Sequence, residues 1–469
     1  MVSDHGLGSV LHAAQGTVLE RGPTGDGRSR AKEGGKVRVA IVGGGYTGLT
    51  AGYELARGGH EVEIFEMAQA LGGQARTFPV AQTRLEAFYH HLFLSDRDIL
   101  SLAEELGLAH RIAWIPSKVG VLYGGRIYPF STPLDLLRFR PLAPWNRLRL
   151  GLVILYLQHT RNWRAFERTT ADAWIPRWAG RQAYEVLWRS LLSGKFGDAY
   201  RRVSMAWFWG KVFLRGGSRR GLGPERLGYP QGSFQVLTDA LADRIRLHGG
   251  RIRTGVPVRR VQIEEGRARA LLLGDGTQAG PFDAVVATVP SPAFLEMVPE
   301  LPEAYARLVA EVRYQVALCL VLQLRRPLSH IYWLNISDPE SPFVGAIEHT
   351  NYIPPETYGG RHFLYLTNYL APDHPYLGCT KEELLAHYLP GIRRINPAFT
   401  PDWVEALWLF QDPGAQPVVT PNYSQRIPPH RTPIPGLYLA NTTQIYPEDR
   451  GTNYSVRLGR KIAREIAPA

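Results

Sequence analysis

The chain has 469 residues, of which 45% are hydrophobic and 20% are charged, and its formal net charge at pH 7 is +12. This length and composition are those of a globular protein, and they predict two intertwined domains with enough interior to bury a cofactor. The two cysteines, Cys319 and Cys379, form no Cys-x-x-Cys pair and no metal-binding spacing. We therefore expect no disulfide framework, no iron–sulfur cluster and no other metal site.

Residues 1–36 are rich in glycine, serine and arginine and show no periodic hydrophobicity, which predicts a disordered leader. The apolar run at residues 10–14 is shorter than the roughly 7–15 residues of a secretory signal. We therefore expect a cytoplasmic protein.

A glycine-rich turn follows the first predicted strand, residues 37–42. Gly43, Gly45 and Gly48 have the spacing Gly-x-Gly-x-x-Gly, and a helix-forming segment begins at Tyr46 and Thr47. In a dinucleotide site the first glycine allows a tight turn, the second lets the backbone approach the pyrophosphate, and the third lets helix pack against strand. The helix N-terminus then supplies amide donors to the phosphates.

A second apolar strand, residues 62–65, ends in an acidic residue. Glu66 lies 18 residues after Gly48, and Met67 follows it. An acid at this distance is placed to accept a hydrogen bond from a ribose hydroxyl. With both strands and the acid in order, the segment predicts an adenine-dinucleotide site that includes Met67.

The next motif distinguishes FAD from NAD. Residues 71–77 read Leu-Gly-Gly-Gln-Ala-Arg-Thr. This resembles the Leu-Gly-Gly-x-x-Arg-Thr/Ser signature of the flavoprotein superfamily of FAD-dependent amine oxidases, protoporphyrinogen oxidases and phytoene desaturases. The resemblance implies that Gly72, Gly73, Gln74 and Arg76 lie near the pyrophosphate and the flavin.

Two strands further along resemble the same superfamily. Residues 254–261 resemble the strand that holds the adenine through a backbone group, here that of Val258. Residues 283–290 resemble the Asp-x-Val-Ile-x-Thr-x-Pro strand that returns to the cofactor domain. The resemblance therefore implies a cofactor domain assembled from separate parts of the chain.

The C-terminal part carries the resemblance to the end of the chain. Residues 435–441 predict a buried strand, and residues 451–454 open a helix that runs to about residue 466. In the superfamily the N-terminus of this helix points at the flavin ring, where amide donors stabilise negative charge. The residues that the resemblance places beside the flavin are Asn441, Gly451, Thr452 and Asn453.

The implied fold is α/β, with a Rossmann-like FAD-binding domain and an inserted α+β substrate domain of mixed sheet and helices. The FAD-binding domain would comprise residues 37–85, 230–295 and 430–469. The substrate-binding domain would comprise 86–229 and 296–429, including a basic, tryptophan-rich helical part at 130–220. Neither Cys379 nor His91 matches a family attachment position, so we expect non-covalent FAD.

Hydrophobic periodicity predicts the elements between these motifs. We expect helices at residues 99–108 and 232–247 and over most of 130–215. Strands are expected at 316–324, 343–349 and 362–370, where they would form the floor of a substrate cavity.

Three departures weigh against amine oxidation. Amine oxidases usually carry a lysine on a central strand, but residues 314–320 contain none. Their C-terminal strand typically reads Phe-Ala-Gly-Glu/Asp, whereas residues 439–441 read Leu-Ala-Asn. The aromatic pair of an amine cage is not evident either.

Nearly all of the net charge lies in one region. Residues 138–220 hold 17 Lys or Arg against four acids, a net charge of +13, and seven of the 11 tryptophans. Three interpretations are open: a helical domain with tryptophans in its core, a peripheral contact with the inner face of the membrane, or a site for an acidic ligand. The apolar run 148–157 is too short to span a bilayer, which takes about 20 residues, and no nucleic-acid-binding module accompanies the charge.

Candidates for chemistry beyond the flavin are fewer. Tyr89 and His91 fall where the family chain passes the flavin and are possible catalytic groups, although a histidine there is more often structural. His349 is the third catalytic candidate, within a polar cluster that ends a predicted strand. The candidate substrate-binding residues are Glu348, Asn351, Tyr352, Lys195 and Arg450. A solvated turn explains the 348–352 cluster equally well, and a helix C-cap explains Lys195.

Together these features predict a FAD-dependent oxidoreductase that removes a hydride from a C–C or C–N bond of a bulky, largely apolar small molecule, such as a porphyrinogen, an isoprenoid or a lipid-linked compound. No second Gly-x-Gly-x-x-Gly follows a strand, so the electron acceptor is expected to be oxygen, a quinone or another carrier. Two alternatives stay open: a flavin-dependent isomerase resembling UDP-galactopyranose mutase, and a non-enzymatic prenyl or lipid carrier resembling Rab GDP-dissociation inhibitors.

Overall fold

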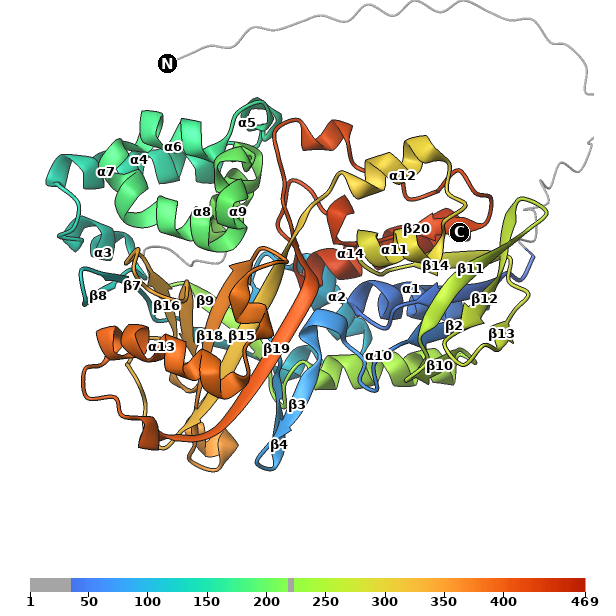
Figure 1. Cartoon of the computed structure of the whole chain (residues 1–469), viewed down its shortest axis with the longest axis horizontal. Coiled ribbons are helices and arrows are strands. Elements are labelled where there is room, and N and C mark those ends of the chain that lie inside the picture. The colour runs from blue at the N-terminus through green and yellow to red at the C-terminus, as the bar shows by residue number, and fades with distance from the viewer. Residues whose placement is uncertain (1–34, 218–222, 469) are drawn as a thin grey trace, which may run out of the picture. The chain divides into compact units, whose positions relative to one another are not determined.

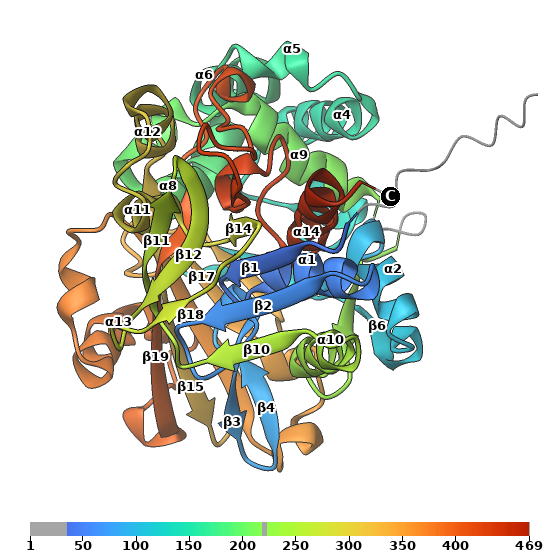
Figure 2. The same ribbon diagram turned by 90° about the vertical axis from the view of Figure 1, so that its right-hand side faces the viewer.

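A five-stranded parallel sheet organises the part of the chain that carries the glycine motif (Figures 1 and 2). In this computed structural model, which describes residues 35–217 and 223–468, the strand order is β10-β2-β1-β14-β20. The strands are β1 (Arg38–Val42), β2 (Glu61–Glu66), β10 (Arg251–Thr254), β14 (Ala284–Ala287) and β20 (Leu437–Leu439). The central strands read as continuous apolar runs because both of their faces are covered.

The two faces of this sheet are covered differently. Val39 and Ile41 of β1 belong to a core that includes side chains of α1 (Tyr46–Arg57), α10 (Gln235–Leu247) and α14 (Thr452–Ile466). Ala40 and Val42 point the other way, into a core shared with the antiparallel sheet β11-β12-β13. The strands of that sheet are β11 (Val258–Glu264), β12 (Arg267–Leu273) and β13 (Gln278–Ala279). The segment predicted as one strand over 254–261 is therefore two, because Gly255, with φ +69°, turns the chain between β10 and β11.

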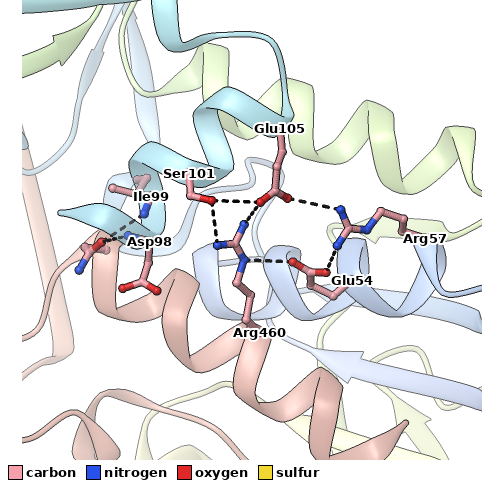
Figure 3. Close-up of polar contacts among 8 residues, drawn as sticks. Glu54, Arg57, Asp98, Ile99, Ser101, Glu105 and Arg460 are labelled. Carbon is pink, nitrogen blue, oxygen red and sulfur yellow. Dashed lines mark hydrogen bonds and ion pairs between the residues drawn. The ribbon is translucent and has the colours of Figure 1, made fainter. Parts of the chain in front are cut away.

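An ion-pair network fixes α14 against α1 and α2 (Arg97–Glu105) (Figure 3). Arg460 of α14 donates from Nε to Glu54 Oε1 of α1 over 3.1 Å, and it also pairs with Glu105 of α2. At the other end of α14, Asn453 Oδ1 accepts from the Asp98 and Ile99 amides at 2.8 and 3.1 Å. These contacts hold the first turn of α14 at the N-terminus of α2.

A seven-stranded mixed sheet has the order β19-β15-β18-β17-β16-β7-β8. Its strands are β7 (Val119–Tyr123), β8 (Arg126–Pro129), β15 (Tyr314–Leu324), β16 (Trp333–Ile336), β17 (Gly345–Glu348), β18 (His362–Leu370) and β19 (Val404–Pro417). The three strands predicted in this region are confirmed. β19 was not predicted, because Asp412-Pro413-Gly414 reads as a turn; the strand passes through it where its pairing with β15 becomes irregular.

The predicted helical stretch is also confirmed (Figure 1). It contains α3 (Pro133–Arg138), α4 (Pro144–His159), α5 (Arg164–Glu167), α6 (Ala171–Ala179), α7 (Arg181–Ala183), α8 (Arg189–Phe196) and α9 (Met205–Gly216). Its tryptophans differ in burial, and Trp163, Trp174 and Trp188 are half-buried. Trp207 and Trp209 of α9 are buried in the core of these helices, whereas Trp145 on α4 and Trp178 on α6 are exposed.

The remaining helices and strands complete the fold. They are β3 (Thr77–Val80), β4 (Thr83–Glu86), β5 (Leu92–Phe93), β6 (Ile112–Pro116), β9 (Arg226–Pro230), α11 (Ser291–Met297), α12 (Glu303–Ala310) and α13 (Lys381–Ile395). The predicted α/β class is thereby confirmed, while the division into two domains stays a proposal. Most of the leader predicted at 1–36 lies outside the described residues.

Candidate cofactor and substrate site

The three motif glycines meet different surroundings. Gly43 has φ +113°, and a Cβ there would lie 2.4 Å from Thr288 Oγ1; a Cβ on Gly48 would lie 2.0 Å from the Gly43 carbonyl oxygen. At Gly45 the nearest atom to an added Cβ would be Gly73 Cα, at 3.7 Å. The protein's own packing thus requires Gly43 and Gly48, whereas the space beside Gly45 is open. α1 begins after Gly45 without a side-chain cap, so its first amides face this space as donors for an anion.

The Gly72-Gly73 turn lies against this glycine loop. The Gly72 amide donates to the Gly44 carbonyl over 2.9 Å, and both Gly72 and Gly73 have positive φ. Gln74 Oε1 accepts from Arg450 Nη1 at 2.8 Å. Arg76 donates to the Gly73 carbonyl over 3.2 Å and lies 5.4 Å from the ring centre of Phe88.

Glu66 lies at the end of β2, beside the same loop. Its Oε2 accepts from the Gly44 amide at 2.7 Å and its Oε1 from the Ala68 amide at 2.8 Å. Each carboxylate oxygen retains a lone pair for a ribose hydroxyl. The Val256 amide donates to the Glu66 carbonyl, which brings the chain leading to Val258 next to this acid. The Met67 side chain is exposed.

Several predicted cofactor residues use their side chains within the protein. Asn453 caps α2, as described above, and Asn441 Oδ1 accepts from the Thr443 amide and hydroxyl. The Tyr46 hydroxyl donates to the Phe234 carbonyl over 3.2 Å, and Thr47 is buried. If these residues contact the cofactor, their backbone groups are the available ones, and the assignment stays a prediction.

Two uncapped helix N-termini flank one turn. Gly45, just before α1, lies next to Gly73 of the Gly72–Arg76 turn. α14 begins after Gly451 without a side-chain cap, and the preceding residue, Arg450, donates a hydrogen bond to Gln74 of the same turn. Amide donors at α1 suit a pyrophosphate, and those at Thr452 suit an electron-accepting ring. Glu66 suits the adenosine ribose, so the donor set fits FAD.

Four charged residues and a tyrosine lie together near the start of α14. We call them the basic–tyrosine cluster: Lys195, Lys211, Asp449, Arg450 and Tyr369. Asp449 Oδ2 lies 3.1 Å from Lys195 Nζ and also pairs with Lys211. Although burial acts to raise it, the positive charges of Lys195, Lys211 and Arg450 hold the pKa of the Asp449 carboxyl well below its usual range.

Tyr369 connects this cluster to the seven-stranded sheet. Its hydroxyl accepts from Arg450 Nη2 at 3.0 Å, and Lys195 Nζ lies 4.8 Å from its ring centre. Burial acts to raise the pKa of Tyr369, but the charges of Lys195 and Arg450 outweigh it and lower the pKa to about 8. Tyr89 is hydrogen-bonded to Tyr369, and burial raises the pKa of Tyr89 well above its ordinary value.

The two predicted catalytic histidines lie in aromatic surroundings. His91 Nδ1 is 3.2 Å from the Tyr332 hydroxyl, and His349 Nε2 is 2.7 Å from the Tyr358 hydroxyl. Burial lowers the pKa of each histidine to about 3. Both rings are therefore neutral at pH 7, and each makes a structural hydrogen bond.

Side chains of the polar cluster at 348–352 hydrogen-bond to the backbone of the loop at 328–331. Glu348 accepts from the Leu328 and Ser329 amides at 2.7 and 2.8 Å, and Asn351 Nδ2 donates to the Ser329 and Ile331 carbonyls. Tyr352 stacks on Tyr332 with ring centres 4.5 Å apart. Of the five predicted substrate residues, Lys195 and Arg450 are the two that belong to the basic–tyrosine cluster; all five assignments stay predictions.

The sequence did not predict three members of the basic–tyrosine cluster, namely Asp449, Tyr369 and Lys211. Asp449 immediately precedes Arg450, which was a predicted substrate residue, but Tyr369 and Lys211 lie on a strand and a helix with ordinary apolar periodicity. Their importance depends on tertiary contacts.

Residues 46–467 match the model of the flavin containing amine oxidoreductase family. The chain belongs to this family. The match confirms the family and the FAD cofactor expected from the sequence, and the predicted enzyme class, a FAD-dependent oxidoreductase, is that of this family.

Individual relatives are distant. A Mycobacterium tuberculosis protein with the provisional name flavin-containing monoamine oxidase AofH is 28% identical over 288 residues, which are 58% of this chain and 61% of that protein. The match thus spans less than two thirds of this relative's length. A solved structure from Exiguobacterium sp. 255-15, provisionally named protoporphyrinogen oxidase, superposes with a TM-score of 0.72 at 18% identity, covering 92% of this chain and 99% of that one. Reduced UDP-galactopyranose mutase also superposes with a TM-score of 0.72, at 15% identity over 92% and 95% of the chains. At these identities the solved structures show a shared fold.

Proposed function

We propose that this protein removes a hydride from a C–C or C–N bond of a bulky, largely apolar substrate, for example a porphyrinogen, an isoprenoid or a lipid-linked molecule. The observation that carries the proposal is a wall of aromatic side chains beside the basic–tyrosine cluster. Tyr89 packs edge-on against Trp333 with ring centres 4.9 Å apart, and His91 lies 5.4 Å from Trp333. Tyr365, which is fully buried, supports Tyr89 from behind with ring centres 6.2 Å apart. Such a wall suits a flat or extended apolar molecule.

In this proposal the residues of the chain position the substrate and handle a proton. Bound FAD supplies the hydride acceptor. The aromatic wall excludes water and orients the reacting C–H bond. Tyr369, whose pKa is lowered, accepts in its phenolate form the proton that leaves together with the hydride, and Tyr89 positions the phenolate oxygen through their hydrogen bond.

An anaerobic titration of the flavin's visible absorbance tests the function. The panel holds a porphyrinogen, a polyene precursor and several amines, each added to the oxidised protein. We expect bleaching by one of the first two. Bleaching by an amine alone would refute the proposed substrate class, and bleaching by none would refute the proposed reaction for this panel.

The isomerase alternative is favoured by one observation, the positive charge of the basic–tyrosine cluster, which suits a nucleotide diphosphate. Its test adds UDP-galactose to pre-reduced protein. A spectral change confined to the reduced form, without bleaching by any C–H donor, would favour the isomerase. The carrier alternative is disfavoured by the open Gly45 cradle and by Glu66, and FAD that copurifies with the protein would eliminate it.

We also propose that the helical part rests on an anionic lipid surface. Ten large hydrophobic side chains are exposed among the described residues, and eight of them lie on α3, α4 and α6. They are Leu134, Leu137, Trp145, Leu148, Leu152, Leu155, Tyr156 and Trp178. Basic residues predominate over this region, which complements anionic headgroups, and tryptophan favours the bilayer interface. No helix in the described ranges, 35–217 and 223–468, is long and apolar enough to cross a membrane.

Vesicle flotation tests this surface. The wild-type protein is expected to float with vesicles of phosphatidylcholine and phosphatidylglycerol and to bind phosphatidylcholine vesicles weakly, because the charge of the helical part needs a counterpart. The double substitution Trp145→Glu, Leu152→Glu should weaken binding at least about tenfold, since two apolar side chains no longer enter the interface. Leu247→Glu on α10, also exposed but outside the helical part, is the matched control. Equal flotation of both variants, or a dimer that only the double variant dissociates, would refute the lipid contact.

A further inference from the structure

Positive charge is in excess beside the aromatic wall. Lys195 of α8, Lys211 and Arg215 of α9, and Arg450 face two carboxylates, Asp449 and Asp412. Four cations and two anions leave a local surplus of two positive charges. The neighbouring carboxylate Glu448 shares Arg457 with Asp98, over 3.0 and 2.9 Å, so this second group carries one net negative charge and reduces the local surplus to one positive charge.

The Asp449 carboxylate has hydrogen-bond and ion-pair partners other than Lys211. Its Oδ2 lies 3.1 Å from Lys195 Nζ, and its Oδ1 accepts from Trp207 Nε1 at 3.0 Å and from Gln416 Nε2 at 3.3 Å. Lys211 shares Oδ2 with Lys195, but 38% of its side chain is exposed, against 13% for Lys195. Lys211 is therefore the cation that can accept a further partner.

Lys211 and Arg215 lie near the aromatic wall, and Lys211 Nζ also lies 5.5 Å from the ring centre of Trp207. The charges of Lys211 and Arg215 both contribute to lowering the pKa of His91, whose ring packs against Trp333. The Arg215 guanidinium itself lies 6.0 Å from the ring centre of Trp333. Surrounding protein lowers the pKa of Lys211 to about 8, so its ammonium group is poorly solvated although part of the side chain is accessible. A desolvated cation gains more from an anionic partner than one in water does.

We propose that Lys211, supported by Arg215, binds an anionic group of the substrate, a carboxylate or a phosphate, while the apolar body of the substrate lies on the aromatic wall. This inference deepens the proposed function and rests on it, because it names the substrate as an amphiphilic anion. The same surplus of positive charge repels a protonated amine. The amine substrates named for relatives are therefore disfavoured on electrostatic grounds.

Isothermal titration calorimetry on the FAD-loaded protein tests the inference without turnover. Three probes share one apolar body: naphthalene-2-carboxylate, 2-naphthyl phosphate and 2-naphthylmethylamine. We expect at least one anion to bind ten times more tightly than the amine or better. Tighter binding of the carboxylate identifies a carboxylate-bearing substrate, and tighter binding of the phosphate identifies a phosphate-bearing one. Equal binding of all three probes would overturn the inference.

Substitutions assign the binding to Lys211. Lys211→Met should weaken anion binding at least tenfold and leave amine binding unchanged or tighter, whereas Lys211→Arg should retain anion binding. Arg189→Met is the matched control, because Arg189 pairs with Glu185 within the same helical part and outside the cluster. Unchanged anion binding by Lys211→Met, with FAD content and melting temperature as in wild type, would overturn the assignment. Since the readout is heat of binding, an enzyme that oxidises none of the panel can still confirm the anion site.

Discussion

Gly45→Ala is expected to fold normally and to lose FAD, whereas Gly48→Ala is expected to lose both FAD and stability. A Cβ at Gly45 meets only Gly73 Cα, at 3.7 Å, and the backbone at Gly45, with φ −77°, accepts any residue. The methyl group would nevertheless occupy the open space that a pyrophosphate needs at the first amides of α1. We expect FAD affinity to fall by at least about tenfold, or 1.4 kcal/mol, with no change in the melting temperature of the apoprotein.

At Gly48 the added Cβ would lie 2.0 Å from a backbone oxygen, so the loop itself must move. Overpacking of this kind costs about 1–3 kcal/mol of unfolding free energy. The flavin-to-protein absorbance ratio reports occupancy, FAD titration of apoprotein gives affinity, and thermal unfolding gives stability. Gly378→Ala is the control, because nothing lies within 4 Å of a Cβ there. Full FAD occupancy in Gly45→Ala would place the pyrophosphate elsewhere.

The sequence predicted the cofactor half of the site because that half is built from local chain geometry. Gly43, Gly45 and Gly48 are fixed by the turn between a strand and the helix that follows it, and Glu66 by the length of one strand–helix–strand unit. The backbone of each segment meets the others once the parallel sheet forms. A motif of this kind can be found in a single sequence because few other requirements produce the same spacing.

The substrate half could not be predicted in the same way. Lys211, Tyr369 and Asp449 come from a helix, a sheet strand and a loop, and each sits in an apolar or ordinary local pattern. What distinguishes them is their mutual distance, which depends on how the helical part packs against the seven-stranded sheet. The cluster at Glu348 shows the converse, since several polar residues in sequence proved to satisfy the backbone of one loop.

The same limit applies to the tryptophans of the basic region. α9 is apolar around most of its surface, and Trp207 is 1% exposed, whereas α4 buries Leu150 and Leu157 and leaves Trp145 73% exposed. Both helices are rich in apolar residues, so periodicity alone did not separate a core helix from one with an apolar outer face. The core interpretation describes α9, while a membrane contact of α4 stays a proposal.

The second large effect that we expect is on the rate of proton transfer, which depends on Tyr369 of the basic–tyrosine cluster. Removing a hydride from a C–H bond to leave a double bond also requires that a proton be accepted. Tyr369 suits this role because Arg450 donates to its hydroxyl and Lys195 lies over its ring. With a pKa of about 8, the phenolate becomes the major form as the pH rises through 8, so kcat should increase over that range.

Tyr369→Phe should lower kcat by about 10²–10⁴-fold and abolish its rise near pH 8, because a phenyl ring cannot accept a proton. Anaerobic flavin reduction, followed by stopped flow from pH 6 to 10 with the substrate that bleaches wild type, measures both effects. Tyr89→Phe is the informative control. It keeps the proton acceptor but removes the hydrogen bond that helps to lower the pKa of Tyr369, so the rise in rate should move to higher pH. A Tyr369→Phe protein that retains the wild-type rise would assign the proton to another group, and a Tyr89→Phe profile that stays at pH 8 would leave Tyr89 without a positioning role.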